Sequence, residues 1–419
     1  MNGDIMLIFV IVLSILLYME YRIYKTCISP FFVIGIIYLV SVSTVRYVAP
    51  ALGYYRLENK TIYLFLIYLS IIFFSDIFFK TVSKKNNREV FYTSEAIVIK
   101  QQKIIWYIFC VMLIGYTLSL LQSIEIYGIY NIKGKSGGIY GHMGLFAIAI
   151  SPYIIYLLVK TKKIKYLISI GILYTIMILF GGKTYLFVSL LASSLFLYAE
   201  HTVKFKKMLK LGIIVGFIGV IFFLLIYAVV PCYQSQLLSL NALKSQIQEA
   251  LEHMFYYFSA PFLCSNSYFD MPAYEGMSEG MKIMFSPVVS IYEAILGDRQ
   301  YPYIIMTNWI QIGDLAHRTT SNVGGLFSES VFHIGYIGSF AYLFIICLYE
   351  NVLYYIKRQC SYFHASSAMA ISILALCFFC NYFTLLVIIE MIVYLLIFET
   401  LLFYMSQNKK YIRDWRFVK

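Results

Sequence analysis

The stretch "MLIFVIVLSILLY" (Met6–Tyr18) decides the class of fold, because it is continuously apolar and carries no charged side chain. It lacks the basic n-region and small-residue cleavage site of a signal peptide, so it predicts a first membrane span. Apolar runs long enough to cross a bilayer recur along the 419-residue chain. Strands of a membrane β-barrel would instead alternate over about ten residues. We therefore expect an all-α polytopic membrane protein.

Composition supports this class, since 61% of the residues are hydrophobic and 13% are charged. A soluble domain is about half apolar and about a quarter charged. We predict about 11 (10–12) spans, and four parts of the chain: residues 1–230 with spans one to eight, 231–332 as one large outer loop, 333–405 with spans nine to eleven, and 406–419 as a basic tail. The predicted spans are 5–19, 30–47, 61–79, 104–122, 143–159, 166–181, 184–200, 211–230, 333–352, 366–381 and 383–405.

The net charge of +12 is explained by topology rather than by a nucleic-acid partner. With the N-terminus outside, six short cytoplasmic segments hold 23 of the 33 Lys and Arg residues. Positive residues collect on the cytoplasmic side of membrane proteins, where they meet anionic lipids. The chain is thus predicted to bind membrane lipids and no nucleic acid.

The loop 231–332 breaks the pattern of short connections. Apolar residues recur in it at helical spacing, which predicts an amphipathic helix resting on the membrane or on the bundle (Leu243, Ile247, Leu251, Met254 and Phe258). A long structured loop in a compact protein is usually functional. No strong internal repeat accompanies it, which weighs against a transporter built of two matching halves.

Two glycine-rich stretches with lysines are candidate anion sites. In "NIKGKSGGIYGHMG" (131–144), backbone N–H groups and two nearby cations, Lys133 and Lys135, suit phosphate, although a plain solvated loop is the alternative. In "FGGKTYLF" (180–187), Lys183 follows a tight glycine turn near a helix N-terminus, which favours phosphate or diphosphate. The alternative is a lysine that reaches the lipid headgroups.

Other candidate residues fall in the outer loop and just after it. In "YYFSAPFLCSNSYFD" (256–270), Tyr256 and Asn266 suit a sugar ring, and an interfacial helix is the alternative. Further along, arginines suited to phosphate stand near small polar, acidic and imidazole side chains (Arg299, His317, Arg318, Asn322, Ser328, Glu329 and His333). The alternative is an ordinary solvated loop.

Two further observations concern metals and intramembrane acids. Of the eight cysteines, two form a CxxC pair, "CFFC" at 377–380, but it lies in a predicted span with no His or carboxylate close by in sequence and is interpreted as packing residues. No Cys/His cluster has metal spacing, so neither a metal nor a cofactor is expected. Glu390 and Glu399 lie in the last span, and Asp76 lies near the end of the third. Intramembrane carboxylates are usually functional, and Glu390 is the better candidate of the two glutamates.

These residues resemble the Wzy-type O-antigen and oligosaccharide repeat-unit polymerases. "GGK" at Gly181–Lys183 is similar to the Gly-(Gly/Ser)-(Arg/Lys) turn that opens a span in this family. "TSNVGGLFSESVFHIGYIG" is similar to its S/T-N-x-x-x-x-F segment followed by a glycine-rich helix start. The architecture covers most of the chain, whereas the motifs cover about thirty residues. Family members commonly have both ends inside, and the outer N-terminus expected here departs from that.

The resemblance implies a metal-independent glycosyltransferase of the bacterial inner membrane with a periplasmic loop, in the fold shared with O-antigen ligases. Its substrate would be an undecaprenyl-diphosphate-linked oligosaccharide, its product lipopolysaccharide O-antigen, capsule or exopolysaccharide, and its partner a chain-length regulator. Lys183, Arg299 and Arg318 would hold the diphosphate, and Glu329, His317 or His333 would be the base. A lipid-linked oligosaccharide flippase and an O-antigen ligase are the alternatives.

Overall fold

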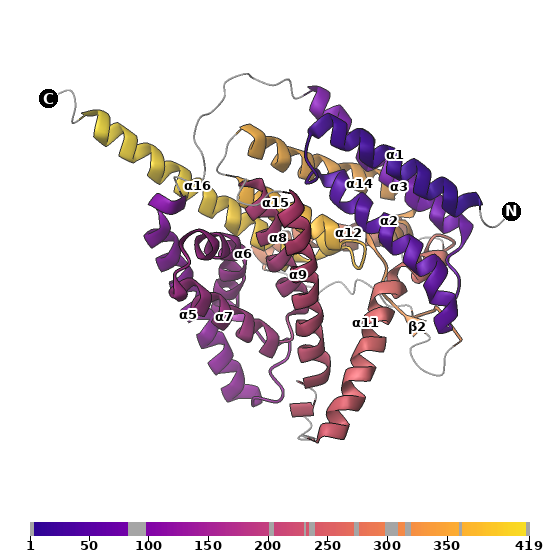
Figure 1. Ribbon diagram of the computed structural model, residues 1–419, viewed down its shortest axis with the longest axis horizontal. Helices are drawn as coiled ribbons and strands as arrows, with labels where there is room; N and C mark the ends of the chain where they lie inside the picture. Colours follow the sequence, from indigo (N-terminus) through magenta and orange to yellow (C-terminus); the bar gives the residue numbers. More distant parts are fainter. Residues whose placement is uncertain are drawn as a thin grey trace. The chain divides into compact units, whose positions relative to one another are not determined.

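The computed structural model describes residues 4–82, 98–200, 205–229, 232–233, 239–271, 276–297, 309–314, 320–359 and 363–415. These residues are mostly helical (Figure 1). The α-helices are α1 (Asp4–Tyr24), α2 (Pro30–Val48), α3 (Asn59–Val82), α5 (Gln102–Tyr127), α6 (Gly138–Thr161), α7 (Ile164–Leu179), α8 (Lys183–Ala199), α9 (Phe205–Leu224), α11 (Leu240–Tyr268), α12 (Gly276–Met284), α13 (Ser286–Leu296), α14 (Leu326–Gln359), α15 (His364–Leu376) and α16 (Leu386–Trp415).

Seven of the described helices are long and apolar enough to cross a membrane, which confirms an all-α polytopic membrane protein. They are α1, α2 with the turn that follows it, α3, α5, α6, α14 and α16. The other predicted spans overlap shorter apolar helices, namely α7, α8, α15 and the end of α9 with the π-helical turn η2 (Leu225–Val229).

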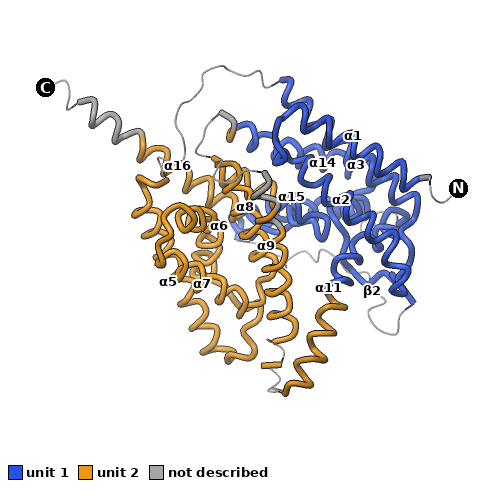
Figure 2. Tube along the Cα trace, in the orientation of Figure 1, with its two compact units in different colours: residues 1–87, 254–355, 373–389 blue, residues 88–253, 356–372, 390–419 orange. Residues whose placement is uncertain are grey.

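The chain divides into two compact units, drawn in separate colours in Figure 2. Unit 1 comprises residues 1–87, 254–355 and 373–389, and unit 2 comprises residues 88–253, 356–372 and 390–419. The units therefore do not follow the four parts expected from the sequence, because each is assembled from three separate segments of the chain.

In unit 1, α1, α2 and α3 pack on one another around an aromatic core. The ring of Phe327, at the start of α14, stacks on Tyr68 with 5.0 Å between centroids and lies 5.1 Å from Tyr38. Phe65 and Phe262 complete this cluster. The first turn of α14 is thus part of the core of unit 1, not a loop at the membrane edge.

The start of α14 differs from the predicted boundary at residue 333, because the helix begins at Leu326. The Leu326 N–H donates to the carbonyl of Cys377 at 2.8 Å, which satisfies a group that a helix start leaves open. A Cβ on Gly325 would lie 2.6 Å from the Phe378 carbonyl oxygen, so glycine allows this close approach. Further along, the helix is kinked at Gly335, whose φ is 65°.

In unit 2, α6 packs against α5, α7 and α8. Two glycines let α5 and α6 approach closely, each facing a large side chain of the other helix. A Cβ on Gly115 would lie 2.4 Å from Met143 Sδ, and one on Gly144 would lie 2.2 Å from Tyr116 Cδ2. Small residues at helix contacts have this role in membrane proteins, where close packing replaces the hydrophobic effect.

The helix predicted in the large loop is present as α11, and α12 and α13 add further helical structure. Two short strands, β1 (Ile310–Gln311) and β2 (Thr320–Ser321), pair antiparallel. A bridge joins Tyr54 to Gly313, and the Tyr55 hydroxyl donates to Asp314 Oδ1 at 2.8 Å. That hydrogen bond raises the pKa of Tyr55. The described parts of the loop are therefore structured and attached to the segment between α2 and α3.

Candidate anion-binding site

The predicted site residues are distributed over both units. Unit 2 contains Lys135 and Lys183, and unit 1 contains Tyr256, Asn266, Asn322, Ser328, Glu329 and His333. Arg299, His317 and Arg318 lie outside the described residues. The roles of all these residues stay predictions. The contacts of the described residues show that they fall into two groups, an accessible site with lysines in unit 2 and buried polar side chains in unit 1.

The turn between α7 and α8 is built by two glycines, as the sequence predicts. Gly181 has a φ of 69°, a conformation that favours glycine. Its N–H donates to the Ile178 carbonyl at 2.9 Å, and the Gly182 N–H donates to the Met177 carbonyl at 2.8 Å. The turn closes α7 and places Lys183 in the first turn of α8.

A second lysine, Lys133 of the other glycine-rich stretch, lies on this turn, which the sequence did not predict. A Cβ on Gly181 would be only 2.8 Å from Lys133 Cγ, so the aliphatic part of Lys133 covers the glycine. The loop that carries Lys133 is held in place because the Gly134 N–H donates to the Phe180 carbonyl at 2.9 Å. Two segments far apart in the sequence thereby bring two lysines to one turn.

Both lysines lie beside Tyr227 in η2. The Lys183 ammonium donates to the Tyr227 hydroxyl and is 4.9 Å from the ring centroid. The Lys133 ammonium is 6.0 Å from the same centroid. The Tyr227 ring is 4.7 Å from the imidazole of His253. We call Lys133, Lys183, Tyr227 and His253 the two-lysine site.

The two-lysine site has the electrostatics of an anion-binding site. Lys133 is exposed and Lys183 is half-buried, so a ligand from water or from the headgroup region can reach both. The N-cap residue of α8 is Gly182, which has no side chain that could accept hydrogen bonds from the first N–H groups of the helix. The positive end of the helix macrodipole therefore adds to the two ammonium charges. This combination suits phosphate or diphosphate.

Unit 2 also contains a histidine–carboxylate pair suited to proton transfer. His142 Nδ1 lies 2.5 Å from Glu390 Oε1, and the Tyr394 hydroxyl donates to the same oxygen. The His142 side chain is 56% exposed, whereas that of Glu390 is 15% exposed. A carboxylate on one ring nitrogen fixes the orientation of an imidazole and leaves the other nitrogen for a substrate.

The histidine–carboxylate pair is connected electrostatically with the start of α8. Tyr185, two residues after Lys183, interacts with the Glu390 carboxylate. Sequence reasoning singled out Glu390 but not its partner, because His142 and Glu390 are 248 positions apart. The available signal was that an intramembrane carboxylate needs a polar partner.

The buried groups of unit 1 have the contacts of structural residues. Glu329 is only 1% exposed, and its Oε2 accepts the Asn381 N–H at 3.1 Å. This bond attaches the segment between α15 and α16, which contains the 3-10 turn η3 (Tyr382–Thr384), to the first turn of α14. His333 is buried as well, and Gly280 of α12 packs directly on its carbonyl. The described partners thus favour a positioning role for both residues.

The side chains predicted to contact sugar mostly have protein partners. Asn266 accepts hydrogen bonds from the Glu58 N–H at 3.0 Å and the Thr61 hydroxyl at 2.8 Å, at the start of α3. The Tyr256 hydroxyl donates to the Thr320 carbonyl at 2.8 Å. Ser328 is fully buried and Asn322 is half-buried. Lys135 is exposed, and its ammonium lies 5.2 Å from the Tyr127 ring centroid.

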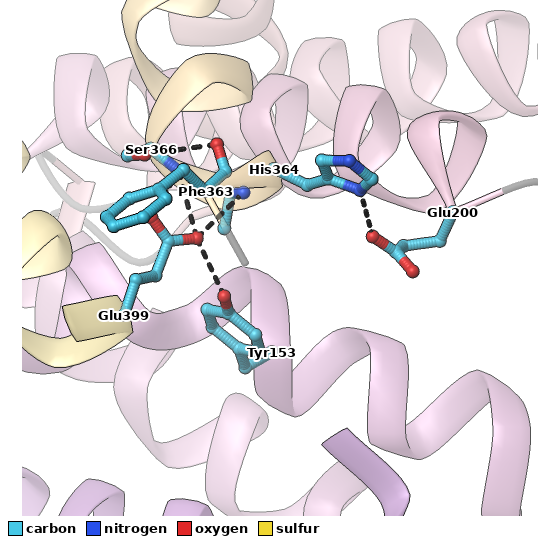
Figure 3. A network of polar contacts seen from close by, with 7 residues as sticks. Tyr153, Glu200, Phe363, His364, Ser366 and Glu399 are labelled. Atoms are coloured by element: carbon cyan, nitrogen blue, oxygen red, sulfur yellow. Dashed lines mark hydrogen bonds and ion pairs between the residues drawn. The ribbon is translucent and has the colours of Figure 1, made fainter. Parts of the chain in front are cut away.

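Glu399 caps a helix inside unit 2 (Figure 3). Its Oε1 accepts hydrogen bonds from the Tyr153 hydroxyl at 2.7 Å and the Ala365 N–H at 3.0 Å, and its Oε2 accepts the Ser366 N–H at 3.3 Å. A carboxylate at a helix N-terminus satisfies open N–H groups and favours the dipole. Glu399 therefore has a structural explanation, which agrees with the preference for Glu390 as the functional acid.

Among the described residues, no group of three or more His, Cys, Asp and Glu is arranged to hold a metal ion. Comparison of the chain with protein-family models, curated proteins and solved structures gives no match.

Proposed function

We propose that the protein is a polysaccharide polymerase that joins undecaprenyl-diphosphate-linked oligosaccharide units at the outer leaflet of a bacterial plasma membrane. The proposal includes about eleven spans, an outer N-terminus and a fold shared with lipid-carrier glycosyltransferases. One observation carries it, namely that Lys133 and Lys183 meet at the Gly181 turn. That arrangement suits the diphosphate of a lipid-linked donor.

The two-lysine site supplies what the leaving group needs. In the transfer, the bond between the anomeric carbon and the diphosphate oxygen breaks, and the acceptor hydroxyl oxygen bonds to that carbon. Negative charge grows on the departing diphosphate. Ammonium groups already in place at this position stabilise the charge without reorganisation, which is usually the largest catalytic effect. Arg299 and Arg318 remain proposed as further cations.

The acceptor hydroxyl loses a proton in the same step, and the proton must go to a base. His142 is our choice for that base, because its imidazole is accessible and Glu390 orients it. Glu390 would also stabilise the imidazolium that forms. Glu329 is far less accessible, at 1% exposure. His333 is buried as well, at 3% exposure, so His317 remains the alternative base.

The test is to delete the gene, to complement it with variants and to measure surface glycan length. We expect Lys183→Ala and Lys133→Ala to leave single repeat units on the surface with normal amounts of protein. Lys244→Ala is the matched control, because it removes one exposed charge from the large loop and should leave long chains. Long glycan persisting in both site variants would overturn the assignment.

The same experiment separates the alternatives. Long polymer retained on its lipid carrier in the deletion strain would identify a ligase. Absence of surface glycan, with units trapped inside, would identify a flippase. One observation favours the flippase as second candidate: the chain between α15 and α16, residues 377–385, is largely buried and contains only a short 3-10 turn, η3 (Tyr382–Thr384). Interrupted helices of this kind line substrate sites in transporters.

A further inference from the structure

Four helices of unit 1 meet at Asp76, a fully buried residue of α3. Asp76 Oδ2 accepts the Phe31 N–H of the first turn of α2 at 2.9 Å. Its Oδ1 accepts the amide Nδ2 of Asn351 in α14 at 2.8 Å. From α1, the Tyr24 hydroxyl donates to the Asp76 carbonyl at 2.5 Å. Neutral donors thus hold one carboxylate at the meeting point.

Two more buried carboxyl groups surround Asp76. Glu20 of α1 is fully buried, and its carboxyl interacts directly with that of Asp76. Glu350 of α14 is 1% exposed and interacts electrostatically with Asp76. Among the described residues, both carboxyl oxygens of Glu20 and of Glu350 are buried without a hydrogen-bond partner. We call Glu20, Asp76 and Glu350 the carboxyl cluster.

The charged and titratable groups that face the cluster do not balance three negative charges. Lys80 of α3 interacts with Glu20, but its ammonium donates to the Ile23 carbonyl and lies 4.5 Å from the Tyr24 ring centroid. From α14, the neutral groups are the Cys347 thiol beside Asp76 and the Tyr349 hydroxyl beside Glu350. From α2, the group near Glu20 is the Ser29 hydroxyl. The residues described around the cluster therefore include one cation for three acids.

An ionised carboxylate buried without a partner is unstable, so such groups take up a proton or pair with a cation. A metal ion is not favoured, since no described group of three acids has the arrangement to hold one. The remaining ligand is the proton. Two carboxyl groups in contact share a proton readily, because like charges at that distance cannot both persist.

We propose that the carboxyl cluster is a proton-binding site within the membrane. Asp76 keeps its negative charge, which the Phe31 N–H and Asn351 stabilise. Glu20 carries a proton that it shares with Asp76, and Glu350 carries a second proton. The site lies towards the ends of α1, α3 and α14 where basic residues predict the cytoplasmic face, so its protons exchange with that side. The assignment does not depend on the proposed polymerase activity.

The test is infrared spectroscopy of the purified full-length protein in lipid at neutral pH. A protonated carboxyl group gives a C=O band that an ionised one lacks. We expect Glu350→Gln and Glu20→Gln each to remove part of this band, and the double variant to remove both parts. Glu58→Gln is the matched control, because Glu58 is an exposed glutamate of the same unit. Its spectrum should match the wild type in this region.

A second measurement needs no substitution and covers variants that fail to fold. In the wild-type protein with carbon-13 in its glutamate carboxyl groups, magnetic resonance separates neutral from ionised side chains. Neutral glutamates at neutral pH are expected. Fully ionised glutamates in the wild type, or an unchanged infrared band in folded Glu20→Gln and Glu350→Gln variants, would overturn the proposal.

Discussion

Replacing Gly181 by alanine tests whether the glycine turn positions Lys133. The substitution has two separable effects. Alanine at a φ of 69° costs about 1 kcal/mol relative to glycine. In addition, the new Cβ would lie 2.8 Å from Lys133 Cγ, so the lysine side chain must move off the turn. The first effect lowers stability, and the second lowers affinity for an anion.

The expected loss of affinity follows from the contact that moves. A charge-assisted hydrogen bond contributes about 1.5–3 kcal/mol, which corresponds to roughly ten- to hundredfold in a dissociation constant. Gly181→Ala should therefore weaken binding of a short lipid diphosphate by up to that factor, as Lys133→Ala does. Because both changes remove the same contact, the double variant should bind hardly more weakly than Lys133→Ala alone. Calorimetry on the purified protein at fixed salt measures the dissociation constants of the two single variants and of the double variant.

Gly297→Ala is the matched control. Its φ of 75° imposes nearly the same backbone strain, but no neighbouring heavy atom of the described chain lies within 4 Å of the added Cβ, and Gly297 belongs to unit 1. It should lower stability by a similar amount, about 1 kcal/mol, and leave affinity within about threefold. Equal losses of affinity in Gly181→Ala and Gly297→Ala would refute the reasoning. So would fully additive losses in the Gly181→Ala/Lys133→Ala double variant.

Three further predictions concern stability and topology. Tyr153→Phe should lower the free energy of unfolding by about 1–2 kcal/mol, because one hydrogen bond is lost. Glu399→Ala should lower it by about 3–5 kcal/mol, because the Tyr153 hydroxyl and two N–H groups of α15 lose the Glu399 carboxylate as acceptor. Denaturation in mixed micelles measures both values, and equal losses would contradict the role of Glu399 as a helix cap. Gly325→Ala should destabilise the fold by about 1–3 kcal/mol in the same assay, since its Cβ would lie 2.6 Å from the Phe378 carbonyl oxygen. Gly171→Ala on α7 is the control and should not destabilise the fold, because no described heavy atom lies within 4 Å of its Cβ. A cysteine at Lys244, in a cysteine-free background, should react with an impermeant maleimide from outside intact cells; labelling only after permeabilisation would reverse the topology.

The sequence predicted the helices better than their ends. Apolar runs and flanking cations locate a span because both depend on local composition. The start of α14 was missed because Ser328, Glu329 and Ser330 resemble a loop in sequence. In the structure Glu329 bonds to Asn381, and Leu326 bonds to Cys377, both about fifty positions away. Such partners make polar residues acceptable in a buried helix, and composition alone does not reveal them.

The two lysine-bearing stretches of the candidate site were predicted as separate anion sites, and their meeting was not predicted. The Gly181–Lys183 turn has a local signature, so sequence reasoning found it. Lys133 joins the turn through contacts across about fifty residues, and Tyr227 and His253 join it from other elements. A tertiary contact of this kind has no periodicity or motif that a single sequence displays, so these partners required the fold.

The intramembrane carboxylates show that role follows from partners and access rather than from residue type. Glu399 has donors at both oxygens and is buried, which makes it a helix cap. Glu390 shares one oxygen with an exposed imidazole, so a proton can pass between the site and water. Glu20 and Glu350 are buried, and their carboxyl oxygens have no hydrogen-bond partner among the described residues, so protonation is the state that we propose for them. Buried carboxylates of one chain therefore have one structural role, at Glu399, and two proposed roles, in catalysis at Glu390 and in proton binding at Glu20 and Glu350.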